Sequence, residues 1–407
     1  SVIRVIQQDS QGGIWVGLDN EGLFLLNTIT DDVHRISTQI GDNRGISTQS
    51  IRSMFVDPLG ILWIGTFGGG LLKYAPAHKD FYVTRHDPGD VNSLSADTIL
   101  SILVDRNQNI WVGTNGGGLN FQQVGAAGFK RYQFDPGNSN GISSNTINAI
   151  LEDRNGDIWI GTGGGGLARY QPGSDSFEVY RHDSTDADTI SDDSVSTLFE
   201  DYAGGLWIGT FDRGLNYFDR ASGLFTRFLH LPSNAGSLSG NSVNTIYQDR
   251  GGNLWVGTTN GLNRFDWESD SFSVFNHDPS IPGGLSDDDI LAIYEDHRGE
   301  LWVGTNGGGL HRYDAENQSF QHFSVQDGLA NEVIYGILED RQGYLWLSTN
   351  SGLSRFNLQT EKFKNYDESD GLPGGEFSPK ANHKGIDGKL YFGGVNGFIS
   401  FYPLEIQ

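Results

Sequence analysis

The chain has 407 residues, of which 57 are glycine, 12% are aromatic and none is cysteine. Hydrophobic residues make up 36%, which is enough for a large core and excludes a disordered chain. The formal net charge of −24 produces a field that repels phosphate backbones and anionic membranes, so nucleic acid is excluded as a partner. The lack of cysteine excludes disulfides, thiolate metal sites and cysteine nucleophiles.

A motif centred on tryptophan recurs along the whole chain. Each of these tryptophans follows Leu or Ile, and in seven of the eight copies the second residue after it is Gly. The motif positions are Trp15, Trp63, Trp111, Trp159, Trp207, Trp255, Trp302 and Trp346, and Tyr391 takes the same place in a ninth copy. The copies are 44 to 48 residues apart, so the sequence predicts nine repeats of one structural unit.

The order of elements within a copy is clearest in residues 147–180. An apolar stretch at 147–152 ends at the turn signal Asp153-Arg154-Asn155-Gly156, and a β-branched and aromatic stretch follows at 158–162. Glycines separate this stretch from a third one at 167–170, and a fourth lies at 177–180. Four short strands with no helical period predict one blade of a β-propeller.

The fold class that follows is all-β: a single β-propeller of about nine four-stranded blades that spans 1–407 as one domain. The ninth copy ends after its third strand near residue 402. We therefore expect the first and ninth blades to meet, with the ninth left three-stranded or completed by the tail. Eight blades with an irregular ninth copy is the alternative, because propellers typically have four to eight blades. The recurrent indole is expected to pack between blades and to donate its N–H to one partner.

The repeat resembles a known family. The pattern Ile-x-x-Ile-x-x-Asp-x-x-Gly-x-Leu-Trp-Ile-Gly-Thr-x-x-Gly-Gly-Leu-x-x-Tyr stands almost whole at 51–74, 147–170 and 290–313, and it resembles the two-component regulator propeller repeat. The resemblance implies the periplasmic sensor domain of a hybrid histidine kinase or diguanylate cyclase, a receptor that often detects oligosaccharides. Residues 388–397 with Pro403 look like the last repeat of the family. In the family an immunoglobulin-like domain and a membrane span usually follow.

The resemblance also bears on partners. Any kinase or cyclase activity would lie in a domain outside this sequence. Contact with the membrane is expected only through a C-terminal segment that this sequence lacks, and a homodimer is expected in the full receptor.

Two kinds of loop share one face of a propeller: those between second and third strands, and those that lead to the next blade. Because the repeats are otherwise alike, differences on this face are expected to set ligand specificity. The candidate ligand-binding residues in the first kind of loop are Phe67, Asn115, Phe211, Arg213, Asn306 and Asn350. Flat rings, amide donors and acceptors, and one cation suit sugars. The alternative is structural, with Asn in a turn at positive φ and Phe packed on the next blade.

Acidic residues precede several predicted innermost strands and are expected to rim the central funnel. They are Asp97, Asp193, Asp288 and Glu332. Clustered carboxylates there would attract cations, and Asp186, Asp188, Asp192 and 287–289 could supply oxygen ligands for Ca²⁺. The alternative, which we favour, is an Asx-turn in which each side chain caps the entry to its strand. We predict no cofactor, with Ca²⁺ as the one alternative.

The sequence carries no catalytic signature, so no enzymatic activity is expected. His86, His182 and His277 recur in equivalent loops, which favours a structural role for them. A carbohydrate-active lyase or hydrolase, or a protein-binding scaffold, is the alternative to a sensor. The ligand is expected to be a neutral or weakly charged oligosaccharide, because the chain is strongly acidic and Arg213 is the main exception on the predicted binding face.

Overall fold

The computed structural model describes residues 2–8, 14–19, 22–26, 33–36, 50–57, 62–67, 70–74 and 81–406. It is an all-β protein that divides into two compact units, residues 1–79 and residues 80–407. Each unit is described by itself below.

The second unit consists of seven four-stranded sheets among the described residues. Six of them each contain four strands that are consecutive in the chain and pair antiparallel. They are β9–β12 (Ile99–Val104, Ile110–Thr114, Leu119–Gln122, Lys130–Tyr132), β13–β16 (Ile147–Glu152, Ile158–Thr162, Leu167–Gln171, Ser176–Tyr180), β17–β20 (Val195–Glu200, Leu206–Thr210, Leu215–Asp219, Leu224–Phe228), β21–β24 (Val243–Gln248, Leu254–Thr258, Gly261–Asp266, Ser271–Phe275), β25–β28 (Ile290–Glu295, Leu301–Thr305, Leu310–Asp314, Ser319–Phe323) and β29–β32 (Ile334–Glu339, Tyr344–Thr349, Gly352–Asn357, Lys362–Tyr366). Short 3-10 helices stand at Val325–Asp327, Glu368–Asp370 and Pro403–Glu405.

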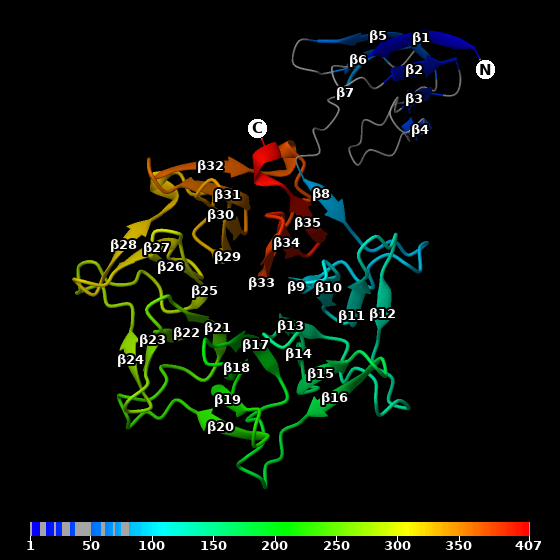
Figure 1. The fold of residues 1–407 in the computed structure, drawn as a ribbon. Helices are drawn as coiled ribbons and strands as arrows, with labels where there is room; N and C mark the ends of the chain where they lie inside the picture. The colour runs from blue at the N-terminus through cyan, green and yellow to red at the C-terminus, as the bar shows by residue number, and fades with distance from the viewer. Residues whose placement is uncertain are drawn as a thin grey trace. The chain divides into compact units, whose positions relative to one another are not determined.

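The seventh sheet closes the ring with strands from both ends of this unit. It contains β33 (Phe377–Lys384), β34 (Leu390–Gly394), β35 (Gly397–Phe401) and, on its outer edge, β8 (Tyr82–Thr84). β8 pairs antiparallel with β35, and the Phe81 ring packs 4.9 Å from the Phe401 ring, centroid to centroid. Figure 1 shows the innermost strands β9, β13, β17, β21, β25, β29 and β33 around the axis and β8 on the rim beside β35.

Close packing of a second strand on the innermost strand of the next sheet joins neighbouring sheets. A Cβ added at Gly161, the glycine of one tryptophan motif, would lie 2.6 Å from the Val195 side chain of the following sheet. A Cβ at Gly393, in the last sheet, would lie 2.6 Å from the Ile99 side chain. The last sheet therefore packs on the sheet that begins at β9, and the ring contains seven blades.

The first unit contains the two remaining sheets. One has four strands, β1–β4 (Ile3–Gln8, Ile14–Leu18, Gly22–Leu26, Val33–Ile36), and the other has three described strands, β5–β7 (Ile51–Val56, Leu62–Thr66, Gly70–Tyr74). Trp15, Ile51 and Leu62 are buried in a core that the two sheets share.

The predicted class, an all-β propeller built from nine sheets, is confirmed, whereas the predicted closure is corrected. A single ring of nine or eight blades would join the first copy to the last, but the described strands close a ring of seven within residues 80–407. The physical reason is β8: in sequence it continues the second copy, yet its backbone completes the last sheet. Without β8, β35 would be an unpaired edge.

Each motif tryptophan from Trp63 to Trp346 is hydrogen-bonded to the aspartate of the turn before it. The indole N–H donates to one carboxylate oxygen at 2.8–3.0 Å, as predicted for a buried indole. The pairs are Trp63–Asp57, Trp111–Asp105, Trp159–Asp153, Trp207–Asp201, Trp255–Asp249, Trp302–Asp296 and Trp346–Asp340, the first of them in the first unit. The rings also reach the next blade, as Trp207 does at 5.4 Å from the Phe265 ring.

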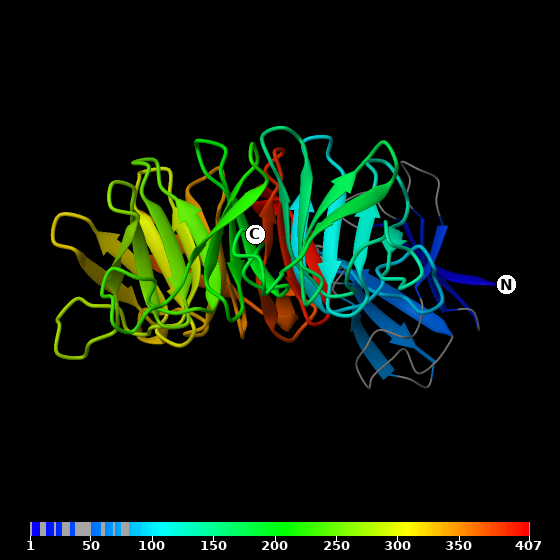
Figure 2. The ribbon, with the colours of Figure 1, turned by 90° about the horizontal axis from the view of Figure 1, so that it is seen from below.

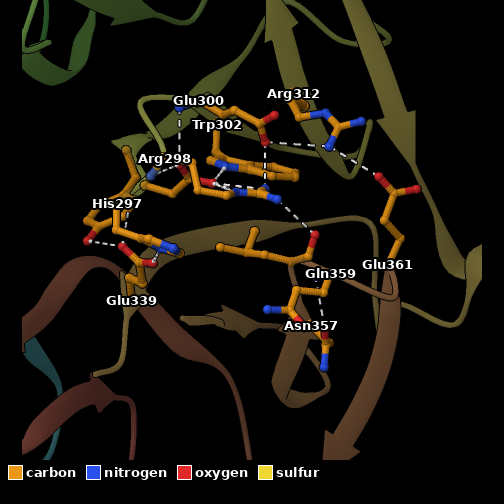
Figure 3. Close-up of polar contacts among 12 residues, drawn as sticks. His297, Arg298, Glu300, Trp302, Arg312, Glu339, Asn357, Gln359 and Glu361 are labelled. Carbon is orange, nitrogen blue, oxygen red and sulfur yellow. Dashed lines mark hydrogen bonds and ion pairs between the residues drawn. The ribbon is translucent and has the colours of Figure 1, made fainter. Parts of the chain in front are cut away.

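Figure 3 shows one of these junctions, around Trp302. Asp296 accepts from the indole at 3.0 Å and from the backbone N–H of Arg298 at 2.8 Å. Burial of Asp296 opposes ionisation, but these hydrogen bonds outweigh it and hold the pKa of Asp296 below its usual value. The Arg312 guanidinium lies 5.6 Å from the indole centre and pairs with Glu361 at 3.1 Å. The Asp296 carboxylate also accepts from the Arg298 guanidinium at 3.2 Å, so it links the turn, the indole and that guanidinium.

We predict that Asp201→Ala lowers the free energy of unfolding by about 2–4 kcal/mol. The substitution leaves two buried donors without an acceptor, the Trp207 indole and the Gly205 backbone N–H, and each costs about 1–3 kcal/mol. Urea unfolding followed by tryptophan fluorescence measures the change. Asp212→Ala is the control, because Asp212 is exposed. Equal stability of the two variants would contradict the role given to the turn aspartate.

Candidate functional site

One end of the ring carries both kinds of variable loop, and we call it the loop face. It is the end at which the innermost strands begin and the second strands finish. The two kinds of loop are hydrogen-bonded there, with the Phe211 N–H donating to the Ser194 carbonyl at 3.1 Å and the Asn115 N–H to the Thr98 carbonyl at 2.9 Å. Figure 2 shows the sheets of the ring edge-on, with connecting segments at two opposite faces.

The candidate residues of the first kind of loop occupy equivalent places but have different surroundings. Asn115 is exposed, Asn306 donates through its amide to Asp289 at 2.9 Å, and Asn350 accepts from the Tyr335 hydroxyl at 2.6 Å. Phe211 is 40% exposed. Part of the Phe211 ring is therefore accessible on the loop face.

Two further candidates differ from the rest. Phe67 belongs to the first unit, is 68% exposed and lies under the Arg52 guanidinium, 4.9 Å from its ring centre. Arg213 is exposed on the loop of Phe211, and its backbone N–H donates to the Thr210 hydroxyl at 3.0 Å. In the described part of the chain Arg213 forms no ion pair. Its side chain therefore remains a candidate ligand-binding cation.

The four residues predicted to rim the funnel hold loops together. Each accepts a hydrogen bond from a backbone N–H seven or eleven positions earlier, at the start of its own loop, which is a loop-closing contact and not the predicted Asx-turn. The bonds join Asp97 to His86 at 2.9 Å, Asp193 to His182 at 2.7 Å, Asp288 to His277 at 2.5 Å and Glu332 to Val325 at 3.1 Å. The recurrent histidines therefore belong to the same loop structure, since their Nδ1 atoms also bond to loop carbonyls.

The acidic clusters that could supply calcium ligands are also engaged in turns. Asp186 accepts from the Asp188 N–H at 2.9 Å, Asp192 from Ser194 at 2.9 Å, and Asp287 from Asp289 at 2.8 Å. Within the described ranges no group of three or more acidic or histidine side chains is arranged to hold a metal ion. The calcium alternative gains no support from this geometry.

A cavity of about 500 Å³ opens on the loop face between the β29–β32 sheet and the last sheet. Its residues include Asn350, Asp367, Glu368, Leu372, Pro373, Glu376 and Asn396. Apolar surface from Leu372 and Pro373 is thus combined with amides and carboxylates. The Asp367 carboxylate caps a short helix by accepting from Ser369, and these hydrogen bonds hold the pKa of Asp367 below its usual value. Of the candidate residues, Asn350 lies in this cavity.

A lysine reaches the axis of the ring from the strand that follows this cavity. Lys380 on β33 donates to the Ser196 carbonyl of β17 at 3.0 Å, a partner 184 positions away in the sequence. Its ammonium lies 5.7 Å from the centre of the Phe211 ring. Below it, a cavity of about 360 Å³ lies along the inner strands and is lined by Asn148, Thr197 and His383 among others. Lys380 itself lines this cavity, which we call the central channel, and because Ser196 is the second residue of β17, Lys380 lies toward its loop-face end.

The environment of Lys380 disfavours its charge. The side chain lines the central channel and is half-buried, and loss of bulk water around the ammonium lowers the pKa of Lys380 to about 8. The negative charge of Asp289 opposes this decrease. Desolvation also lowers the pKa of His383 to about 4, so this imidazole is neutral at pH 7.

Sequence reasoning missed Lys380 because it searched for differences among equivalent loop positions. A signal was present in the ninth copy, where the innermost strand reads Phe-Ser-Pro-Lys-Ala-Asn-His-Lys instead of the apolar pattern of the other copies. Its extra residues could have marked the strand as irregular.

Comparison with known proteins finds one repeat family along most of the chain. The family model "two component regulator propeller" matches residues 45–68, 93–116, 141–164, 189–212, 237–260, 284–307 and 328–351. Among solved structures, the chain is similar to the extracellular domain assigned to a hybrid two-component system of B. thetaiotaomicron, with 28% identity and a TM-score of 0.74. That match covers 98% of this chain and 56% of the other, so this chain spans just over half the length of its relative.

More distant similarities concern the fold alone. They include a virginiamycin B lyase from Staphylococcus aureus (15% identity, TM-score 0.57, covering 79% of this chain and 98% of the lyase). Another is PorZ of the type-IX secretion system of Porphyromonas gingivalis (13% identity, TM-score 0.55, covering 98% of this chain and 62% of PorZ). Comparison with curated proteins finds no significant match. In the part of the chain that the structure describes, no helix is long and apolar enough to cross a membrane.

We predict that Lys380 makes stability depend on pH between about 8 and 10.5. In this window the unfolded chain binds more protons at this lysine than the folded chain, so folding is favoured as pH rises. The free energy of unfolding of the wild type, minus that of Lys380→Met, should therefore increase by on the order of 1–3 kcal/mol. Urea unfolding at pH 7, 8, 9 and 10 measures it. A difference that stays constant with pH would show that the ammonium is not desolvated.

Proposed function

The chain belongs to the two-component regulator propeller repeat family, and we propose that it is the extracytoplasmic ligand-binding domain of a bacterial signal-transduction receptor that senses an oligosaccharide. The family and the extracellular relative at 28% identity support a sensor outside the cytoplasm. We also propose that the full receptor has a kinase or cyclase output domain, is attached to the membrane through a C-terminal segment, and forms a homodimer.

The observation that carries the sugar proposal is the cavity on the loop face. It stands where the ring is least regular, between the last repeat with a motif tryptophan and the sheet that closes the ring. Sugars present both apolar C–H faces and hydroxyl groups that donate and accept hydrogen bonds. The apolar patch of Leu372 and Pro373 and the amides of Asn350 and Asn396 match both kinds of surface.

The charge of the cavity supports a neutral sugar there. Asp367, Glu368 and Glu376 all contribute to its wall, and carboxylates accept hydrogen bonds from hydroxyls while they repel sulfate groups. The proposal does not include turnover of the sugar. Asp367 is held ionised by its hydrogen bonds, so it has no proton to donate to a glycosidic oxygen at neutral pH.

We predict that Asn350→Ala combined with Asn396→Ala weakens binding of a neutral oligosaccharide at least tenfold. Each lost amide hydrogen bond is worth about 0.5–1.5 kcal/mol net, and about 1.4 kcal/mol corresponds to a factor of ten. A glycan array identifies the best neutral binder, and titration calorimetry with that glycan measures the change.

The matched control is Thr259→Ala. Thr259 occupies the loop position equivalent to Asn350 and is exposed, but it does not line the cavity. Unchanged affinity in the control and reduced affinity in the double variant would support the cavity as the binding site. The reverse result would place binding elsewhere on the chain, and cleavage of the glycan would replace the sensor proposal by an enzyme.

A further inference from the structure

The innermost strand of the last sheet has a different register from the other six in the ring. In those six, a single bulge sets two steps of the innermost strand against one step of its neighbour. In β33, the five steps from Phe377 to Asn382 face only two steps of β34. The surplus residues include Lys380, which reaches β17. The irregularity therefore brings a cation to the axis.

The backbone at Lys380 is in an uncommon conformation. Its φ is 64°, and it is the one residue other than glycine with positive φ inside a described strand, since the other five such residues lie in turns. An L side chain is strained there. Strain of this kind persists where the surroundings fix it, and it clusters at ligand-binding and functional sites.

The ammonium of Lys380 has donors to spare. It has three N–H groups, and the Ser196 carbonyl is its one hydrogen-bond acceptor among the described residues. No carboxylate in that part of the chain forms an ion pair with it. Two donors therefore remain for groups that enter from the loop face.

The nearest charge of opposite sign is already occupied. Asp289 influences Lys380 through space, but its two carboxylate oxygens accept from the amides of Asn244 at 2.7 Å and Asn306 at 2.9 Å. Asp289 is thus held away from the ammonium. Lys380 can therefore bind one negatively charged group of a ligand, and the charge of Asp289 would repel a second such group.

An exposed ring stands beside this cation. Phe211 is 40% exposed, and its centre lies 5.7 Å from the Lys380 ammonium. The apolar face of a sugar can pack on such a ring while a charged substituent reaches the ammonium. The loop-face cavity with its acidic wall is formed by residues near Lys380 in the sequence. Glu376 and Phe377 line that cavity, and Lys380 follows them on β33.

Resting on the proposed sugar-sensing function, we propose that Lys380 and Phe211 form a subsite for one uronic acid residue, a sugar with a single carboxylate, at the loop-face mouth of the central channel. Neutral residues of the same oligosaccharide would occupy the cavity of Asn350. One ammonium binds one carboxylate. Asp289 on one side and the acidic cavity on the other exclude chains with many negative charges.

The test is a glycan array probed with the 407-residue chain and its variants. The array carries xylo-oligosaccharides and gluco-oligosaccharides as neutral members, the same backbones with a single glucuronic acid, and heparin-derived sulfated oligosaccharides. The variants are Lys380→Met, Lys380→Arg, Phe211→Ala and the loop control Thr259→Ala. Phe211→Ala tests the subsite without altering β33, which keeps the result interpretable if Lys380→Met folds poorly.

We expect the wild type to bind a glucuronic acid form at least tenfold more tightly than its neutral parent. Lys380→Met and Phe211→Ala should abolish this preference, Lys380→Arg should retain part of it, and Thr259→Ala should leave it unchanged. Preference for sulfated members, or a glucuronate preference that survives both Lys380→Met and Phe211→Ala, would overturn the subsite and leave Lys380 as a structural tie to β17. Binding of neutral members alone rejects the subsite while the proposed function stands, and binding of no glycan rejects both.

Discussion

The hydrogen bond between the motif indole and the turn aspartate is the interaction on which the rest of the ring depends. A buried indole N–H without an acceptor is costly, and in the seven copies for which the structure describes the pair, the acceptor is the aspartate six positions earlier, as in Trp159 with Asp153. The other oxygen of Asp153 accepts the backbone N–H groups of its own turn. Each of these repeats thus contains the carboxylate that accepts from its own indole. It therefore depends on neighbouring repeats for packing and not for this hydrogen bond.

This self-sufficiency explains why the loop face can vary. The turn, the indole and the glycine of the motif are fixed by packing against the next blade, as Gly161 is against Val195. The loops at the beginning of the innermost strands are instead held by local hydrogen bonds such as that from His182 to Asp193. Residues of the loop face that take no part in these contacts with their side chains can differ from one repeat to the next. Phe211, in the loop after β18, is such a residue and is exposed.

Much of the fold could be predicted from the sequence because the pattern repeats. The strand at 158–162 and the turn at Asp153 were predicted where the structure has them. Ring closure could not be predicted, because β8 looks like the last strand of the second copy and only its pairing with β35 assigns it to the last sheet. A repeat pattern contains no information about which copy begins the ring.

The candidate site was predicted only in part, for a related reason. Asn350, Asn306 and Phe211 were identified because the residue at their loop position differs from one repeat to the next. In the structure Asn350 lines the cavity, Asn306 donates to Asp289, and Phe211 lies beside Lys380. Asp97 and its equivalents cap loops instead. Lys380 was missed because its place depends on surplus residues in β33, which no comparison of aligned positions reveals.

Thermal unfolding of two shortened chains tests the closed seven-bladed ring most directly. Residues 80–407 retain β8, whereas residues 89–407 lack β8 together with Phe81, which is buried against Phe401. The account predicts that 80–407 unfolds in one cooperative transition, and that 89–407 unfolds at least about 4 °C lower, since loss of a buried Phe alone costs about 3–5 kcal/mol and a unit of this size shifts by roughly 1.5 °C per kcal/mol. Equal midpoints for the two chains would show that β8 does not close the ring and would contradict the account.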